Sequence, residues 1–72
     1  MGVSGMVMNE EIGRIAGEIW QLLTERGEMS LSSVVMALNT SQSTAYMALG
    51  WLAREDKLEF VKKRRGVLVR LK

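Results

Sequence analysis

Apolar residues recur every three or four positions in the first third of the chain. Polar residues of the same segment fall on the opposite side of a helical projection, which predicts an amphipathic helix over residues 10–26. We expect Asn9 to cap the N-terminus of this helix and Gly27 to end it in the left-handed conformation. The apolar positions are Ile12, Ile15, Ala16, Ile19, Leu22 and Leu23.

Two shorter helices are expected in the middle of the chain, over residues 31–38 and over residues 42–55. Each follows a serine that can cap its first turn, Ser30 for the first helix and Ser41 for the second. The three polar residues between the two helices, at 39–41, indicate a tight turn. A short extended piece at 28–30 precedes the first of the two helices. This part of the chain therefore predicts a helix, a turn and a second helix.

The period of the pattern changes from 3.6 to 2 after Asp56. Apolar and polar residues then alternate over residues 57–61 and again over residues 67–72. A polar, basic segment at 62–66 separates the two runs, and its Gly66 can adopt a positive φ. Two such runs joined by a glycine-containing loop predict a β-hairpin.

The predicted order of elements is helix, short strand, helix, helix, strand, strand, in an α+β fold that is mainly α. Three helices followed by a basic β-hairpin, the wing, are the plan of a winged helix-turn-helix. In such modules the helix after the tight turn enters the major groove, and the wing approaches the nucleic-acid backbone. No proline or linker interrupts residues 9–72, which we expect to form one domain behind a flexible tail over residues 1–8.

Composition narrows the chemistry that the chain can perform. The 72 residues include no cysteine and no histidine, which excludes disulfides, thiol nucleophiles, zinc fingers and imidazole bases. Neighbouring carboxylates such as Glu10 and Glu11 do not face each other on a helix. We therefore expect a protein that is not an enzyme, with no catalytic residue, no metal ligand, no cofactor and no small-molecule ligand.

Charge is unevenly distributed along the chain, although the net charge is only +2. Residues 1–40 hold two basic and five acidic side chains, whereas residues 41–72 hold eight basic and three acidic ones. A small domain with one basic end favours an anionic partner. No signal peptide or membrane-spanning run is recognisable, so we expect a cytoplasmic protein that has no membrane partner.

Three segments of the sequence are distinctive: IGRIAGEIW at residues 12–20, the SL step at residues 30–31 and LGWLARED at residues 49–56. Together they resemble a family of small prokaryotic winged helix-turn-helix proteins of unknown function. The resemblance covers about residues 12–72. It implies the winged-helix fold and a soluble, dimeric, prokaryotic protein, and it implies no established activity.

The basic segment before Gly66 is the strongest candidate for a binding feature. Its four cations can reach phosphates and add affinity that does not depend on sequence: Lys62, Lys63, Arg64 and Arg65. The third helix would face the groove of double-stranded DNA with Gln42, Ser43, Tyr46 and Arg54. We also expect the hydroxyls of Ser43 and Thr44 to favour an anionic oxygen at the start of this helix.

Nucleic-acid binding, with a role in transcription regulation, is therefore the first hypothesis. The basic segment is equally compatible with a solvated hairpin tip that discourages edge-to-edge aggregation.

A protein-interaction module without DNA binding is the alternative hypothesis. The third helix is apolar nearly all round, which is typical of a buried helix. A glycine stripe on the first helix indicates a close contact, either with the domain's own hairpin or third helix or in a homodimer. Trp20, Met29 and Met36 are expected to pack in the core or in an interface. The candidate interface residues of a homodimer are Gly13, Gly17, Trp20, Met47, Gly50 and Trp51.

Overall fold

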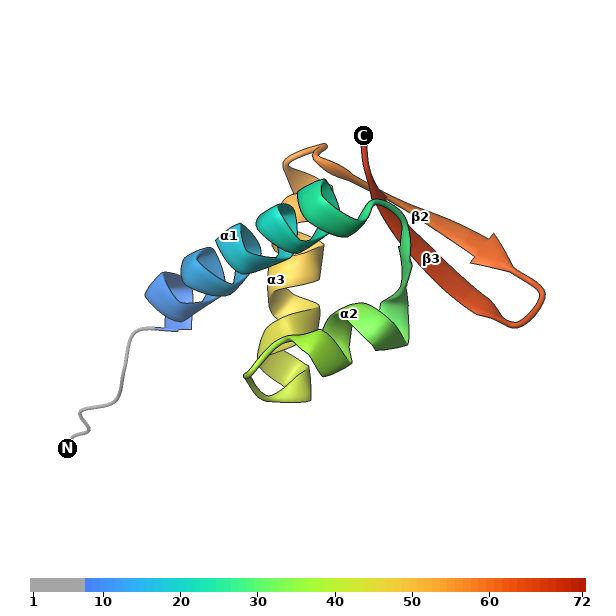
Figure 1. Ribbon diagram of the computed structural model, residues 1–72. Coiled ribbons are helices and arrows are strands. Elements are labelled where there is room, and N and C mark those ends of the chain that lie inside the picture. The colour runs from blue at the N-terminus through green and yellow to red at the C-terminus, as the bar shows by residue number, and fades with distance from the viewer. Residues whose placement is uncertain (1–7) are drawn as a thin grey trace, which may run out of the picture.

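The computed structural model describes residues 8–72, which form three helices and a small antiparallel sheet (Figure 1). This α+β fold, mainly α, has the predicted order of elements. The expected tail over residues 1–8 lies outside the described residues, apart from Met8 at the start of the first helix. The elements are α1 Met8–Arg26, β1 Met29–Ser30, α2 Leu31–Ala37, α3 Gln42–Arg54, β2 Leu58–Lys63 and β3 Gly66–Leu71.

α1 begins two residues before its predicted start, so Asn9 lies inside the helix and does not cap it. The prediction for Asn9 is wrong because a polar residue is also compatible with the first turn, where Glu10 and Glu11 interact favourably with the helix dipole. The predicted end of the helix is confirmed. Gly27 has φ +76°, and its N–H donates a hydrogen bond of 2.8 Å to the carbonyl of Leu23.

Serine caps begin both shorter helices, as predicted. The Oγ atom of Ser30 accepts a hydrogen bond of 3.2 Å from the N–H of Ser33 in α2. The Oγ atom of Ser41 accepts one of 3.2 Å from the N–H of Thr44 in α3. Each bond satisfies an N–H group that the first turn of a helix leaves without a partner. α2 ends one residue earlier than predicted, because the backbone of Leu38 is extended.

The sheet joins segments that are far apart in the sequence. β3 is the central strand and pairs antiparallel with β2 on one side and with the two-residue β1 on the other. Val69 of β3 therefore has Phe60 of β2 and Met29 of β1 as its two neighbours. The pattern predicts the hairpin and the extended piece, but two residues are too few to predict the pairing of β1 with β3.

The hairpin turn is shorter than expected. Strand pairing continues to Lys63 and Gly66, so only Arg64 and Arg65 lie in the turn. Gly66 has φ +154°, a conformation that glycine adopts readily because it has no Cβ atom. The predicted positive φ is confirmed. The predicted loop over residues 62–66 is too long, because regular strand pairing includes three of its five residues.

The core lies between the helices and one face of the sheet. α1 packs against α3, and the hairpin extends away from the helices (Figure 1). The completely buried apolar side chains come from α1, α2, α3 and β3: Ile15, Ile19, Val34, Ala45, Ala48 and Val69. Each hairpin strand has six residues, about 20 Å, so the far end of the hairpin lies outside this core. Among residues 8–72 we find no helix that is long and apolar enough to cross a membrane.

Candidate nucleic-acid interface

Four cationic side chains surround the far end of the hairpin. Lys62 and Lys63 are the last residues of β2, Arg64 and Arg65 form the turn, and all four are exposed. Successive side chains of a strand point to opposite faces of the sheet, so the two lysines project to different sides of the hairpin. The fold thus brings the predicted basic residues together in one cluster, which we call the wing tip (residues 62–65).

Acidic side chains neutralise the hairpin near its base but not at the wing tip. Glu59 and Arg70 are paired across β2 and β3, and Arg70 Nε donates a hydrogen bond of 2.8 Å to Glu59 Oε1. Arg70 Nη1 also lies 3.7 Å from Glu28 Oε2. Within residues 8–72, no carboxylate forms an ion pair with any wing-tip cation. Uncompensated positive charge is therefore concentrated at the end of the hairpin.

A contact between Lys72 and Asp56 lies at the opposite end of the hairpin. Lys72 Nζ donates a hydrogen bond to the carboxylate of Asp56, which has φ 63° in the connection between α3 and β2. This hydrogen bond and the negative charge of Asp56 raise the pKa of Lys72 above its ordinary value of 10.5. Lys72 is thus cationic at neutral pH, but a carboxylate compensates its charge, in contrast to the wing tip.

The predicted groove-facing residues of α3 are exposed. Gln42, Ser43 and Tyr46 lie in the first two turns of the helix, and Arg54 lies in its last turn. Gln42 Nε2 donates a hydrogen bond of 3.3 Å to the hydroxyl of Tyr46, one turn further along. These side chains offer amide, hydroxyl and guanidinium groups to a partner.

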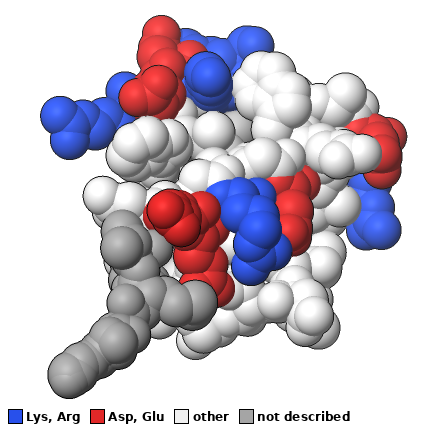
Figure 2. All heavy atoms as spheres, turned by 90° about the vertical axis from the view of Figure 1, so that its left-hand side faces the viewer, with Lys and Arg blue, Asp and Glu red and all other residues white. Residues whose placement is uncertain are grey.

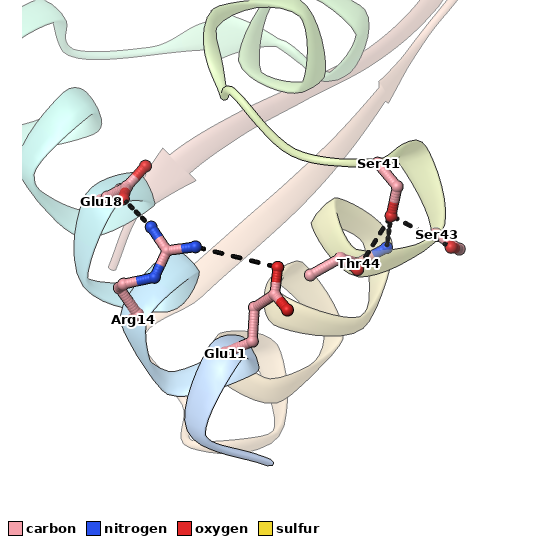
Figure 3. Close-up of polar contacts among 6 residues, drawn as sticks. All are labelled: Glu11, Arg14, Glu18, Ser41, Ser43 and Thr44. Atoms are coloured by element: carbon pink, nitrogen blue, oxygen red, sulfur yellow. Dashed lines mark hydrogen bonds and ion pairs between the residues drawn. The ribbon is translucent and has the colours of Figure 1, made fainter. Parts of the chain in front are cut away.

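Thr44 does not have the role expected from the sequence. Its side chain is buried, and the hydroxyl of Ser41 donates a hydrogen bond of 2.9 Å to its Oγ1 atom (Figure 3). The Oγ atom of Ser43 lies 3.4 Å from that of Ser41 in the same cluster. Thr44 is therefore part of the helix cap, and of the two hydroxyl residues predicted to meet an anion only Ser43 is exposed.

α3 is amphipathic within the protomer, so this chain by itself covers only one side of its third helix, and burial of the other side by a partner stays a prediction. The side that packs in the core consists of Ala45, Ala48, Leu49 and Leu52, together with Thr44. The open side includes Met47, Gly50 and Trp51, which are exposed. The sequence shows apolar residues all round the helix, but within residues 8–72 nothing covers the open side. With so few hydrogen-bond donors, this side is poorly suited to reading base edges.

A groove of about 330 Å³ lies between α1 and α3, next to the open side of α3. We call it the tryptophan groove; its lining residues are Gly13, Ala16, Gly17, Trp20, Trp51, Leu52 and Lys57. A Cβ atom added at Gly13 or Gly17 would meet no atom within 4 Å. The interpretation of these glycines as a close contact with the hairpin or α3 is therefore wrong, and the homodimer interface stays a prediction.

Trp20 and Met36 do not fill the core. Trp20 is 44% exposed, and the Nζ atom of Lys57 lies 5.7 Å from the centroid of its ring, within the range of a cation–π contact. Met36 is 84% exposed, whereas Met29 packs against the core as expected. The sequence analysis missed Lys57. The available signal was its place in the short connection between α3 and β2, where a long cationic side chain can reach a neighbouring helix.

Comparison with known proteins connects these features to a family. The family model described as the winged helix-turn-helix domain DUF2582 matches residues 6–71. This chain belongs to the DUF2582 family. The match includes every helix and strand from α1 to β3, so it confirms both the winged-helix fold and the family resemblance of the three sequence segments. DUF2582 thus places the chain among the winged helix-turn-helix domains, a class of modules that bind nucleic acid.

Two relatives are similar to this DUF2582 chain over most of its length. The uncharacterised protein MJ1608 of Methanocaldococcus jannaschii is 42% identical in an alignment of 65 positions that covers 86% of this chain and 91% of that protein. The solution NMR structure of protein BT2368 from Bacteroides thetaiotaomicron has a TM-score of 0.78 and 28% sequence identity, and the match covers 90% of this chain and 79% of that one. The name of neither relative states an activity.

Proposed function

We propose that this DUF2582 protein binds double-stranded nucleic acid, with the wing tip on the phosphate backbone. The observation that carries the proposal is the group of four exposed cations at residues 62–65, which form no ion pair within residues 8–72. The family supports the same partner, because winged helix-turn-helix domains are typically modules that bind nucleic acid without catalysing a reaction.

Counterion release would give the wing tip affinity without sequence readout. Each phosphate that a lysine or arginine neutralises releases condensed counterions, so the logarithm of the binding constant falls linearly with the logarithm of salt concentration. The slope is about −0.9 for each phosphate of B-form DNA, and four contacts correspond to a slope of about −3.6. A strongly salt-dependent, weakly selective association is therefore the expected behaviour.

α3 would lie toward the groove, with Gln42, Ser43, Tyr46 and Arg54 as its contacts. Among these side chains, the Gln42 amide and the Arg54 guanidinium are the groups that can bind a base edge through two hydrogen bonds. A role in transcription regulation requires that such contacts distinguish one sequence from another. The open side of α3 is otherwise largely apolar. We therefore expect the difference in binding free energy between duplex sequences to be small compared with the free energy of the phosphate contacts.

A titration of labelled duplex DNA of random sequence with the full chain tests this proposal. Fluorescence anisotropy at several salt concentrations should show binding at low salt, with a slope between about −2 and −3.6. The absence of binding at low salt, or an affinity that does not change with salt, would contradict the proposal. Either result would favour the alternative that the wing tip is a solvated hairpin end.

A further inference from the structure

We propose that the tryptophan groove binds an unpaired base of single-stranded nucleic acid, and that Lys57 contacts a phosphate beside that base. The groove lies between α1 and α3 and includes no residue of the wing tip, so the inference does not rest on the proposed binding of duplexes. It starts from the aromatic side chains, which this fold leaves in contact with water.

None of the four aromatic side chains of this protein is buried. They are between 43% and 52% exposed, whereas the core consists of aliphatic side chains. Aromatic rings usually supply much of the energy of a core or an interface when they are covered. Two of the four line the same groove, Trp20 from α1 and Trp51 from α3. The fold therefore presents two indole rings to a partner at one place.

The floor of the groove lets a flat group approach the backbone of a helix. Gly13 and Gly17 line the groove on α1, and a Cβ atom at either position would meet no atom within 4 Å. Glycine inside a helix is destabilising relative to alanine, and no packing within the described residues offsets that cost. The volume of about 330 Å³ lies at the lower end of the range for small-ligand sites, about 300–1,000 Å³. The groove therefore suits one flat, compact group.

The charge of the groove is positive and uncompensated. Within residues 8–72, Lys57 is the only charged residue that lines it, and the Nζ atom of Lys57 lies 5.7 Å from the centroid of the Trp20 ring. No carboxylate of these residues forms an ion pair with Lys57, and the adjacent Asp56 is paired with Lys72 instead. The groove therefore combines aromatic walls with one free cation, which favours an anionic aromatic ligand.

The carboxylates of α1 do not cancel this charge. Arg14 Nη1 donates a hydrogen bond of 2.8 Å to Glu18 Oε2, and Arg14 Nη2 lies 3.8 Å from Glu11 Oε2 (Figure 3). Figure 2 shows the side of the molecule from which α1 starts, where acidic and basic groups lie next to each other with uncharged surface between them. The negative charge of α1 is thus compensated locally, and the cation at the groove keeps its attraction for an anion.

An unpaired base with its phosphate has the properties that this site requires. Every base has a flat aromatic face that stacks on an aromatic side chain, and the phosphate beside it supplies the negative charge. Lys57 already lies over the ring of Trp20, so we expect the base to stack on Trp51. Paired bases of a duplex are stacked on each other and would have to be unstacked first, at a cost in free energy. The groove therefore favours a single strand over a duplex.

Further contacts on α3 favour a strand over a free nucleotide. Tyr46 lies five residues before Trp51 and Arg54 lies three residues after it, and all three side chains are exposed. Aromatic rings together with cations along one surface are typical of proteins that bind single strands, because successive nucleotides contact successive side chains. A free nucleotide would have only Lys57 for its phosphate. We therefore assign the groove to a base within a strand.

Titration of the full chain with oligothymidylate of about ten nucleotides tests the proposal. Trp20 and Trp51 are the two tryptophans of the chain, so intrinsic tryptophan fluorescence reports on the groove. We expect the oligonucleotide to quench this fluorescence at low salt, and a duplex of the same length to quench it much less. Trp51→Ala should weaken binding of labelled oligothymidylate about tenfold or more, measured by anisotropy, because the stacking surface is lost.

Two further variants separate the shape of the groove from its charge. Gly17→Gln fills the floor from a position where the side chain meets open space, so it should weaken binding while circular dichroism shows an unchanged fold. Lys57→Met removes the cation and should make the salt slope for the single strand about 0.7 less negative. Met36→Ala is the matched control, because it removes an 84% exposed apolar side chain outside the groove and should bind as the wild type does.

Several results would overturn the proposal. These are an absence of quenching at low salt, equal quenching by the duplex, and unchanged binding by both Trp51→Ala and Gly17→Gln. Thymidine monophosphate that binds as tightly as the oligonucleotide would overturn the assignment to a strand. A dimer that forms without nucleic acid and that Trp51→Ala dissociates would also overturn the proposal, and would assign the groove to a second copy of the chain.

The same titrations distinguish this proposal from the binding of duplexes by the wing tip. Lys63→Ala/Arg64→Ala should lose affinity for duplex DNA but retain the quenching by oligothymidylate at saturation, because neither residue lines the groove. Quenching by the single strand without any binding of duplexes would support the groove site and contradict the proposed function. Binding of duplexes without quenching by the single strand would contradict the groove site alone.

Discussion

Glu59 and Arg70 lie opposite each other on β2 and β3, joined by a hydrogen bond of 2.8 Å from Arg70 Nε to Glu59 Oε1. Three and four residues further along β2, Lys62 and Lys63 have no such partner within residues 8–72. The hairpin is therefore divided into a compensated part and a cationic end. Charge can be changed in one part without changing the other, which makes the proposed binding testable.

Glu59→Gln should weaken the fold slightly and strengthen nucleic-acid binding. An exposed ion pair contributes about 0.2–1 kcal/mol, so the free energy of unfolding in urea should fall by less than about 1 kcal/mol. Removing a negative charge near the wing tip should raise the affinity for duplex DNA at low salt, measured by anisotropy. Glu10→Gln makes the same charge change in the first turn of α1, at the end of the helix far from the hairpin (Figure 1), and should alter the affinity less. Weaker binding by Glu59→Gln would argue against contact between hairpin and backbone.

Ser41→Ala should destabilise the domain by about 1 kcal/mol, within a range of about 0.5–2 kcal/mol for lost N-caps. The substitution removes the acceptor of the Thr44 N–H and the donor to the buried Thr44 hydroxyl. Thermal or urea denaturation measures the loss. Ser43→Ala is the matched control, because Ser43 is exposed and should leave stability within about 0.5 kcal/mol of the wild type. Equal stability of both variants would contradict the role of the Ser41 cap.

Gly17→Ala should stabilise the isolated protomer by up to about 1 kcal/mol. Alanine is the better helix former, and its Cβ atom would meet no atom of the described chain within 4 Å. The measurement is urea denaturation at concentrations low enough for the protein to be monomeric. A destabilised protomer would mean that another part of the chain approaches this face of α1, as the sequence alone had indicated.

Alkaline pH should remove the stabilisation that Lys72 provides. Its pKa in the folded protein is raised above 10.5 by Asp56, so the folded state binds this proton more tightly than the unfolded state does. The contribution is fully present below about pH 10.5 and is lost as the pH rises through the raised pKa. Urea denaturation as a function of pH should show this loss in the wild type but not in Lys72→Met. Identical curves of stability against pH for the two proteins would contradict the attribution of this stabilisation to Lys72.

The sequence predicts the elements that position the wing tip, because each has a local signal. Ser30 and Ser41 indicate the starts of two helices, Gly27 indicates the end of another, and Gly66 indicates the turn of the hairpin. These features depend on interactions within a few residues of the chain. The candidate site could therefore be located from alternation and charge alone.

The surface around Trp20 and Trp51 could not be predicted in the same way. An apolar residue at helical spacing gives the same pattern whether its own chain covers it or a partner does, and the sequence analysis therefore placed Trp20 in a packed position. The pairing of β1 with β3 depends on long-range contacts of two residues and has no periodic signal. Tertiary packing decides both features.

Salt-dependent binding by the double variant Lys63→Ala/Arg64→Ala tests most directly whether the wing tip contacts phosphates. If both cations contact the backbone, the slope of log affinity against log salt should become about 1.8 less negative, and affinity should fall similarly for every duplex sequence. Arg14→Ala/Arg26→Ala removes two cations from α1 and should retain most of the wild-type slope. A Lys63→Ala/Arg64→Ala protein with the affinity and slope of the wild type would contradict the account.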